Sequence, residues 1–302
     1  MNLLLIGGTG FLGSHLAAVL AAAGHRLTLP TRRRERAKHL ALLPTVEVVE
    51  ADVHNPATLA RLCRGQDAVF SLVGILKGGE GDPYGAGFAR AHVELPQKVA
   101  AACRAAGVPR LIHVSALKAA ADAPSGYLRS KAAGETAVLA AQPEVAVTIV
   151  RPSVIFGRGD SFLTLFAGLL KMAPLVPLAC PAARFQPVWM GDVTTVLAAC
   201  LERTDSHGRA YDLCGPRVYS LRELVAYAGR VSGHPRPILG LPDFASWLQA
   251  WAMEFVPGGP MTRDNVRSMR LPSICDSGCA LPFGIEPTPL EAVAPGYLGP
   301  AA

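Results

Sequence analysis

The sequence predicts an α/β protein built on a doubly wound parallel sheet. A glycine cluster near the N-terminus separates a short apolar run from a helical pattern, and short apolar segments then alternate with helical ones up to residue 157. Half of the 302 residues are hydrophobic and 17% are charged, as is usual where a parallel sheet is buried on both faces. This length gives room for one large or two modest domains.

The first strand and the first helix are predicted within residues 2–24. Residues 3–6 are apolar and end at the glycines, and from Phe11 onward apolar residues recur at helical spacing up to Gly24. A strand, a glycine turn and a helix in this order indicate a Rossmann-type, dinucleotide-binding unit.

The glycines of this turn fit two registers, Gly8-x-Gly10-x-x-Gly13 and Gly7-x-x-Gly10-x-x-Gly13. We expect Gly10 to take a glycine-only conformation where a pyrophosphate approaches, and Gly13 to let the helix pack against the strand. The helix N-terminus would offer free N–H groups and a partial positive charge to the phosphates. A glycine-rich turn without a ligand is the alternative.

The later strands are short, apolar runs that end at polar or glycine residues. They are predicted at residues 26–29, 46–49, 67–72, 110–114 and 145–150, with helices at about 88–106 and 127–141 and an irregular loop at 77–87. Ligands of such sheets bind at the carboxyl ends of the strands, so the residues after the strands should line one edge. These are residues 7–13 and 31–33, Asp52, Gly74, Ser115 and Pro152.

The residues after the second strand bear on the choice of coenzyme. An NAD-preferring Rossmann unit carries an acidic residue about 20 positions past the glycines, to bind the ribose 2′-hydroxyl. Here Thr31 is followed by Arg32 and Arg33. A guanidinium suits a 2′-phosphate by its charge and its fork of donors, so the sequence favours NADP(H) over NAD(H). A solvated basic face is the alternative.

The pair Tyr127-x-x-x-Lys131 is the strongest candidate for chemistry. In a helix the two side chains lie one turn apart on one face, where the ammonium would lower the pKa of the phenol towards the range useful for acid–base work. The same lysine could bind a ribose hydroxyl. Ser115, at the end of a strand, could orient a substrate oxygen. An exposed Tyr–Lys pair is the alternative.

Several motifs occur together in order and at suitable intervals: the glycine turn, Asp52-Val53, Ser115, Tyr127-x-x-x-Lys131 and Arg151-Pro152-x-Val154-x-x-Gly157. Together they resemble the short-chain dehydrogenase/reductases of extended or atypical type, the NAD-dependent epimerase/dehydratase family. The resemblance is strong over residues 1–157 and diffuse afterwards. Residues 113–117, 127–135 and 151–157 are most similar to the branch of the nucleotide-binding accessory subunit of respiratory complex I.

The resemblance assigns roles to these positions. It implies that Asp52 contacts the adenine, that Gly74 passes under the coenzyme, and that Tyr127 is the acid/base, with Lys131 its partner on the nicotinamide ribose. His92 stands where many relatives have asparagine, and we interpret it as a packed helix residue. The predicted catalytic residues are Ser115, Tyr127 and Lys131, with no metal. The predicted coenzyme-binding residues are Gly7, Thr9, Gly10, Phe11, Leu12, Gly13, Thr31, Arg32, Arg33, Asp52, Val53, Val73, Gly74, Pro152 and Val154.

The division into domains is predicted at residues 1–157, the NAD(P)-binding part, and 158–302, a smaller α/β lobe for substrate or partner with some segments returning to the first part. Helices are expected at 193–201 and 221–231, and a strand at 210–213. An apolar stripe at helical spacing is expected to be buried, the alternative being a partner or membrane-surface contact. It consists of Phe244, Trp247, Leu248, Trp251 and Phe255. Candidates for a diphosphate clamp are Arg184, Arg209, Arg217 and Arg222.

Charge and cysteine content exclude some classes of function. The net charge of +6 is largely local to residues 32–38, without interleaved aromatics, so we expect no nucleic-acid partner. Seven scattered cysteines argue against a disulfide framework and for a reducing compartment, and we interpret Cys275-x-x-x-Cys279 as incidental. No signal peptide is visible, and the apolar stretch 162–180 is interrupted by Lys171 and prolines, which favours a buried helix and a loop.

Two functions are compatible with the sequence. One is an NADP-dependent oxidoreductase or epimerase/dehydratase acting on a small carbonyl, alcohol or sugar-nucleotide substrate. The other is a non-catalytic nucleotide-binding structural or assembly subunit similar to the complex I accessory subunit. We expect a cytoplasmic monomer or homodimer, with a position peripheral to the inner membrane and a membrane-surface or respiratory-complex partner as the alternative.

Overall fold

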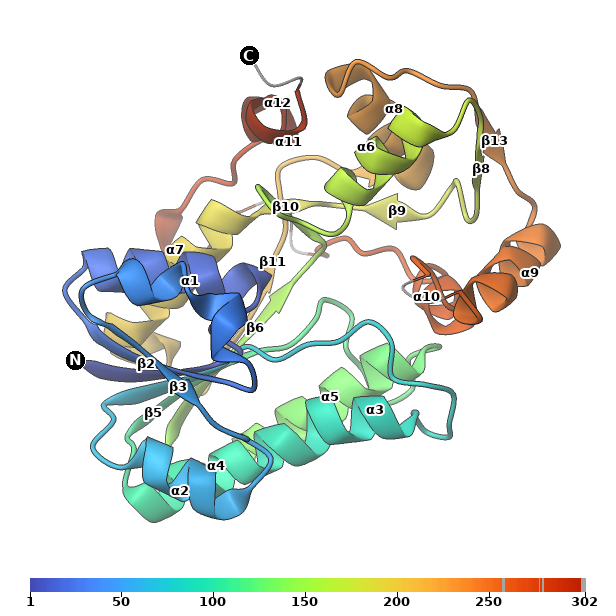
Figure 1. The fold of residues 1–302 in the computed structure, drawn as a ribbon. Helices are drawn as coiled ribbons and strands as arrows, with labels where there is room; N and C mark the ends of the chain where they lie inside the picture. Colours follow the sequence, from blue (N-terminus) through green and yellow to red (C-terminus); the bar gives the residue numbers. More distant parts are fainter. Residues whose placement is uncertain (257–258, 277, 279, 300–302) are drawn as a thin grey trace.

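A parallel seven-stranded sheet in the order β11-β6-β5-β4-β1-β2-β3 forms the centre of the molecule (Figure 1). The computed structural model describes residues 1–302 except 257–258, 277, 279 and 300–302. The predicted Rossmann-type fold is confirmed, and the predicted strands match the observed ones to within two residues at each end. These are β1 Asn2–Ile6, β2 Arg26–Thr31, β3 Val46–Glu50, β4 Ala68–Ser71, β5 Arg110–Val114, β6 Ala146–Pro152 and β11 Ala210–Leu213.

Both faces of the sheet are covered, which is why its strands are apolar without alternation. Leu3 and Leu5 of β1 belong to one core and Leu4 and Ile6 to the other, and all four are fully buried. The first core is closed by α1 (Phe11–Ala22) and α7 (Met190–Glu202). The second is closed by α2 (Pro56–Cys63), α4 (Leu95–Ala106) and α5 (Gly126–Leu139), on the opposite side of the sheet in Figure 1.

The helix predicted at 88–106 is confirmed, but it is not α-helical throughout. A first turn, α3 (Ala86–Phe88), continues into a π-helical stretch at Ala89–Glu94 and then into α4. The π stretch carries the buried His92. Gly107 ends α4 in the left-handed conformation, with φ 67°, that favours glycine at this position.

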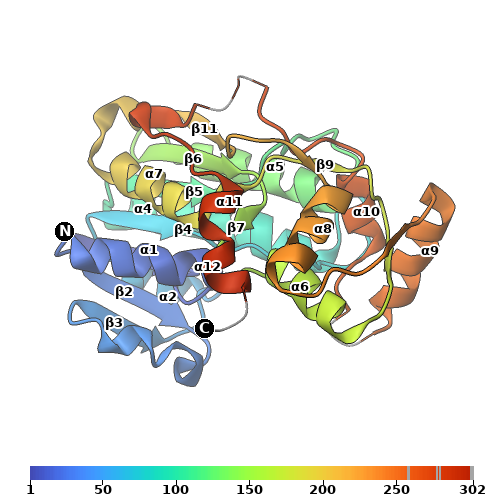
Figure 2. The same ribbon diagram turned by 90° about the horizontal axis from the view of Figure 1, so that it is seen from above.

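The C-terminal part packs two helices, α6 (Leu163–Met172) and α8 (Leu221–Val231), beside the carboxyl edge of the sheet (Figure 2). Ser220 and Glu223 form a capping box that begins α8 at the predicted residue. Strand β11 and helix α7 return to the central sheet, whereas the domain boundary at 157/158 stays a prediction.

The remaining strands are β7 Ile155–Phe156, β8 Val176–Leu178, β9 Arg184–Phe185, β10 Val188–Trp189, β12 Tyr219–Ser220 and β13 Ile238–Gly240. The remaining helices are α9 Asp243–Glu254, α10 Arg263–Ser268, α11 Leu290–Val293 and α12 Pro295–Leu298, with short 3-10 turns at Arg34–Ala37, Leu40–Leu42, Thr204–Ser206 and Pro282–Gly284.

The apolar stripe of α9 was expected to be buried, and this prediction is wrong. Its members Phe244, Trp247, Leu248, Trp251 and Phe255 are 77%, 40%, 45%, 42% and 72% exposed. Helical spacing shows that the five side chains share a face, but it does not tell which way the face points. Here the opposite face of α9, with the small residues Ser246 and Ala250, is the one that packs against the protein.

The scattered cysteines argued against a disulfide framework, yet Cys214 and Cys275 are joined by a disulfide. They are 61 residues apart in sequence, and their Cα atoms are 6.0 Å apart, because Cys214 follows β11 and the chain returns beside β9 at Ser273. A count of cysteines cannot reveal such a meeting. Cys279, the other member of the incidental pair, lies outside the described residues.

The apolar stretch 162–180 forms α6 followed by β8, in place of one long helix. Within the described part of the chain, every helix is too short or too polar for a transmembrane span.

Candidate functional site

The residues predicted to bind a coenzyme or substrate follow the carboxyl ends of adjacent parallel strands. The glycine turn follows β1, Arg32 and Arg33 follow β2, Asp52 and Val53 follow β3, Val73 and Gly74 follow β4, Ser115 follows β5, and Val154 follows Pro152 at the end of β6. Since these strands are all parallel, the structure brings these positions to one edge of the sheet, as expected. The role of each residue stays a prediction.

Three glycines of the turn, Gly7, Gly8 and Gly13, have no room for a side chain, and Gly10 is not one of them. Gly7 has φ 86°, and a Cβ there would meet Val73 N at 3.0 Å. A Cβ at Gly13 would lie 2.3 Å from Gly7 O, so α1 could not pack this closely. Gly10 has φ −83° and ψ −178°, an extended conformation open to any residue, and its Cβ would meet only Gly7 O, at 3.3 Å. The prediction of a glycine-only conformation at Gly10 is therefore wrong.

The N-terminus of α1 fits an anion. Gly10 is exposed and Thr9 half-buried, and the first turn holds no acidic residue, whereas Leu12 is anchored in the core. The first main-chain hydrogen bond of the helix runs from Ser14 N to Gly10 O, at 2.9 Å, so the preceding N–H groups have no acceptor within the helix. These groups and the helix dipole suit a phosphate placed beside Phe11.

The two arginines after β2 are exposed and lie in a turn organised by Thr31. The Thr31 Oγ1 accepts a hydrogen bond from Arg33 N at 3.3 Å. No ion pair between described residues uses Arg32 or Arg33. Their guanidinium groups are thus available to a further phosphate.

Asp52 and Gly74 show different surroundings. The Asp52 Oδ1 accepts a hydrogen bond from His54 N at 2.9 Å, so the aspartate organises the turn after β3. Its side chain is nonetheless exposed at the sheet edge. Gly74 is exposed too, and a Cβ there would meet no atom within 4 Å. The space above Gly74 is open to a ligand passing along the end of β4.

The Tyr127–Lys131 pair is not the exposed pair that was the alternative interpretation. Lys131 is 3% exposed, and its Nζ donates to Val114 O at 2.7 Å, which places it beside the end of β5. The next residue, Ser115, is 4% exposed, and its Oγ has no hydrogen-bond partner among the residues that the structure describes. A buried hydroxyl without a partner is costly, and it points to a ligand oxygen at this position.

Burial governs the pKa values of the pair. Burial raises the pKa of Tyr127 to about 12, so the prediction that Lys131 lowers it is wrong for this structure. Burial also lowers the pKa of Lys131 from 10.5 to about 8, and the nearby Glu135 carboxylate opposes this shift. Near neutral pH the pair therefore presents a protonated phenol and an ammonium.

The buried ammonium gives a testable dependence of stability on pH. Because the pKa of Lys131 is lower in the folded protein, the unfolded chain binds more protons between about pH 8 and 10.5, and the contribution of this group to stability rises with pH there. Lys131→Met removes the cost of the buried charge. This gain in stability is greater at pH 7 than at pH 10. We expect the difference between the two free energies of unfolding, variant minus unmutated protein, to be larger at pH 7 than at pH 10 by about 2 kcal/mol.

The measurement is urea unfolding of both proteins at both pH values. Terms that do not depend on pH, such as the lost bond to Val114 O, cancel in this double difference. A relative stability that is the same at pH 7 and pH 10 would contradict a buried, ionised Lys131.

His92 is a packed residue, as interpreted from the sequence. Its Nε2 accepts from Ile75 N at 3.0 Å, and its Nδ1 lies 2.9 Å from Ser130 Oγ. Since Ser130 Oγ donates to Tyr127 O at 2.7 Å, Nδ1 is the donor to Ser130 and the ring is neutral. Burial lowers the pKa of His92 to about 3, and its ring packs between those of Phe88 and Tyr127.

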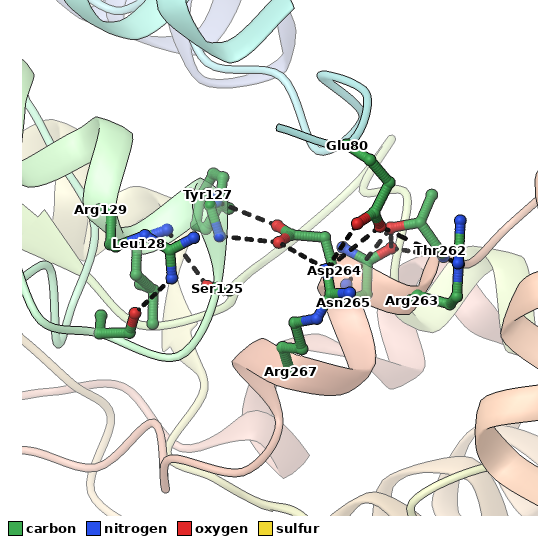
Figure 3. A network of polar contacts seen from close by, with 12 residues as sticks. Glu80, Ser125, Tyr127, Leu128, Arg129, Thr262, Arg263, Asp264, Asn265 and Arg267 are labelled. Atoms are coloured by element: carbon green, nitrogen blue, oxygen red, sulfur yellow. Dashed lines mark hydrogen bonds and ion pairs between the residues drawn. The ribbon is translucent and has the colours of Figure 1, made fainter. Parts of the chain in front are cut away.

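Asp264 positions the helix that carries the Tyr–Lys pair, and it had no sequence signal. Its Oδ1 accepts from Gly126 N at 2.7 Å and its Oδ2 from Tyr127 N at 3.0 Å, so a buried carboxylate from α10 caps the N-terminus of α5 (Figure 3). An acidic group there stabilises the helix end. The two segments are 138 residues apart. The capping box of Thr262 and Asn265 could at most have marked the start of α10.

A second polar network, in which only Glu135 is buried, supports α5 from β6. Arg151 donates through Nε and Nη2 to the two carboxylate oxygens of Glu135, one turn after Lys131. Asp212 of β11 lies 3.8 Å from the same guanidinium. The Arg-Pro motif thus holds the helix that carries the Tyr–Lys pair.

A cavity of about 240 Å³ is lined in part by Phe88 and Asp264, which both contact Tyr127. Its walls come from the loop 77–80, from Phe88 and from the α9–α10 region, including Glu254 and Asp264. A larger cavity, of about 650 Å³, lies at the opposite, amino edge of the sheet.

Arg209 precedes β11 at that amino edge and Arg217 pairs with Glu291, so the four predicted arginines do not converge on a clamp.

Comparison with known proteins agrees with this geometry. The model of the NAD dependent epimerase/dehydratase family matches residues 3–214. The chain is 32% identical, over 95% of its length and 77% of the relative's, to the mitochondrial NADH dehydrogenase (ubiquinone) 1 alpha subcomplex subunit 9 of Mus musculus. It is 34% identical to the ceramide reductase of Caulobacter vibrioides, over 79% of this chain and 73% of that one.

The fold is also that of solved epimerases. The UDP-glucuronic acid 4-epimerase of Bacillus cereus superposes with a TM-score of 0.69 at 18% identity, over 91% of this chain and 95% of that one. The resemblance drawn from the motifs, including that to the complex I accessory subunit, is confirmed. The protein belongs to the NAD-dependent epimerase/dehydratase family of short-chain dehydrogenases/reductases.

Proposed function

We propose that this protein binds NADP(H) at the turn between β1 and α1. It then catalyses a hydride transfer to or from a substrate that is a small carbonyl compound, an alcohol or a sugar nucleotide. The observation that carries the proposal is the buried Ser115 hydroxyl. Its Oγ has no hydrogen-bond partner among the described residues, and it follows Val114, to whose carbonyl Lys131 donates, at the same sheet edge as the glycine turn. The epimerase/dehydratase family, the reductase relative and the NAD-containing structures of similar fold support it.

Each residue of the site has a distinct part in this mechanism. A bound nicotinamide coenzyme supplies or accepts the hydride. The Tyr127 phenol, protonated at neutral pH, gives its proton to the substrate oxygen in the direction of reduction. Ser115 Oγ donates a hydrogen bond to the same oxygen. The Lys131 ammonium, charged below about pH 8, stabilises the phenolate that is left and offers its further N–H groups to a ribose hydroxyl.

The preference for NADP(H) rests on the two free guanidinium groups after β2. Replacing Arg32 and Arg33 with alanine should weaken NADPH by roughly one to two decades, because a charge-assisted contact is worth about 1.5–3 kcal/mol. The affinity for NADH should change little, since NADH has no 2′-phosphate. Calorimetric titration with both coenzymes measures this, and Arg64→Ala, an exposed arginine at the amino edge, is the control.

The outcome of this titration also tests the proposal as a whole. Binding of neither coenzyme to the unmutated protein would remove its basis. Equal affinity for the two coenzymes would leave nucleotide binding in place and contradict the assignment of the arginines.

A non-catalytic role is the second candidate. The observation in its favour is that the chain is 32% identical to the complex I subunit over 95% of its length. In that case the protein is a structural or assembly subunit of a respiratory complex, at the cytoplasmic face of an inner membrane, and it binds a nucleotide without turnover. The two candidates differ in what Tyr127 does, and a variant of that residue separates them.

A further inference from the structure

Helix α9 is amphipathic, but its apolar face points to solvent, whereas an ordinary surface helix turns its apolar face to the core. Its large apolar side chains face solvent, with Phe244 77% and Phe255 72% exposed, and the Trp251 ring packs edge-on against Phe255 at 5.2 Å. Ser246 and Ala250, on the other face, are fully buried.

Polar contacts fix this orientation. The Ser246 Oγ accepts from Cys180 N at 3.1 Å and donates to Leu241 O at 3.3 Å. Gln249 Nε2 donates to Pro177 O at 3.1 Å. The helix is thereby attached to β8 and to the segment before it, so it cannot rotate the apolar stripe inward without leaving these partners unbonded.

The stripe continues onto neighbouring elements. Leu239 of β13 is 53% exposed and pairs with Pro177 of β8, the residue that α9 contacts. Leu175, just before β8, is 46% exposed, and Met172, at the end of α6, is 79% exposed. Figures 1 and 2 both show α9 at an extremity of the molecule, away from the central sheet. We call these three residues and the α9 stripe together the apolar face.

Basic side chains flank the apolar face. Lys171 adjoins Met172, and Arg236 donates from Nε to Leu170 O at 3.3 Å, beside the same helix end. Arg222 lies next to Gly240 of β13, and Arg270 follows Met269, which packs on the cluster of β8. All four are exposed, and none takes part in an ion pair between described residues.

Acidic groups near the face are few. Glu254, at the end of α9, is neutralised by Arg263 at 2.8 Å. Asp243, at the start of α9, is the exposed carboxylate on the helix. The flank of the apolar face is therefore positively charged.

We propose that the apolar face docks this protein onto the surface of an anionic lipid bilayer, with α9 lying in the plane of the interface. Exposed tryptophan and phenylalanine side chains favour the headgroup region, and flanking lysine and arginine are attracted to anionic lipids. A second copy fits less well, because a two-fold interface formed by this face would bring the basic side chains of both copies into one interface with few acidic partners. Glu254 also lines the cavity that Phe88 and Asp264 line, so the docked face borders that cavity.

Docking requires neither coenzyme nor turnover, so it can be tested by binding alone. The full-length protein is floated with vesicles of phosphatidylcholine, with and without added phosphatidylserine, at low and at high salt. We expect binding to vesicles that contain phosphatidylserine and its loss at high salt. Phe244→Ser/Phe255→Ser should lower the partition onto these vesicles at least about tenfold.

A charge variant tests the flank. Lys171→Glu/Arg270→Glu should lower the partition by about tenfold or more on vesicles with phosphatidylserine, with little change on phosphatidylcholine alone. Leu42→Ser, which removes a leucine that is 84% exposed in the turn before β3, and Arg64→Glu are the controls and should bind like the unmutated protein. Circular dichroism checks that all variants fold.

Several outcomes would overturn the proposal. One is failure of the unmutated protein to bind anionic vesicles at low salt. Another is binding that survives in both double variants. A concentration-dependent dimer that only the Phe244→Ser/Phe255→Ser variant loses, without vesicle binding, would assign the face to a second copy. Binding to a respiratory complex without any affinity for vesicles would assign it to a protein partner.

Discussion

Replacing Tyr127 with phenylalanine is expected to lower hydride transfer by about 10²–10⁴-fold, the usual loss on removal of an acid/base group. The variant loses only the phenolic proton donor. Its ring can still pack against Phe88 and His92, whose centroids lie 6.0 and 5.5 Å from that of Tyr127. The affinity for NADPH should stay nearly unchanged, because the glycine turn and Lys131 remain. Oxidation of NADPH in the presence of a panel of ketones, aldehydes and sugar nucleotides measures the rate.

Complementation of a deletion strain applies the same test without a known substrate. The matched control is Tyr211→Phe, which removes the hydroxyl of a tyrosine on β11 whose ring packs on Phe283, and it should retain full activity. Full rescue by Tyr127→Phe, together with failure of a variant that cannot bind nucleotide, would exclude a catalytic role. The protein would then act as a non-catalytic, nucleotide-binding subunit.

Replacing Gly10 with valine is expected to lower the affinity for the nucleotide by about a hundredfold or more while the protein stays folded. The extended conformation of Gly10 is open to any residue, and a Cβ there would meet one atom, Gly7 O at 3.3 Å, a close contact that only a small shift of the turn has to relieve. The branched side chain would occupy the position where the pyrophosphate approaches the α1 N-terminus, and two lost charge-assisted hydrogen bonds of about 1.5 kcal/mol each account for the factor. The free energy of unfolding should change by no more than about 1 kcal/mol.

Gly13→Val is the contrasting variant. Its Cβ would lie 2.3 Å from Gly7 O, so α1 must move away from β1, and we expect a loss of about 3 kcal/mol or more in the free energy of unfolding. Calorimetry and urea unfolding separate the two effects. NADPH binding to Gly10→Val with unchanged affinity would contradict a nucleotide site at this turn.

The sequence by itself determined the fold and the edge at which the site lies. Apolar runs that end in glycine or polar residues predicted six of the seven parallel strands, because strands buried on both faces must be apolar throughout. The seventh, β11, was expected as a strand, and the structure placed it in the central sheet. Because the strands are parallel, their carboxyl ends lie at one edge, which brings the glycine turn, Ser115 and the Tyr127–Lys131 pair to that edge without any knowledge of side-chain contacts.

The properties of these side chains were decided by the tertiary structure. The spacing of Tyr127 and Lys131 predicts that they are neighbours, but their pKa values depend on burial, which raises that of the phenol and lowers that of the amine. Asp264 caps α5, the helix of the Tyr–Lys pair, from 138 residues away, and Cys214 meets Cys275 across 61 residues. Such meetings depend on how distant segments pack, and no local pattern encodes them.

The apolar stripe of α9 shows the same limit most clearly. Periodicity placed Phe244, Trp251 and Phe255 on one side of a helix, because side chains three and four residues apart share a face. Which side turns to the protein was decided by the opposite face, where Ser246 and Gln249 bond to the main chain around β8. The sequence therefore determined that a stripe exists, and only the packing of α9 on its neighbours determined that the stripe faces solvent.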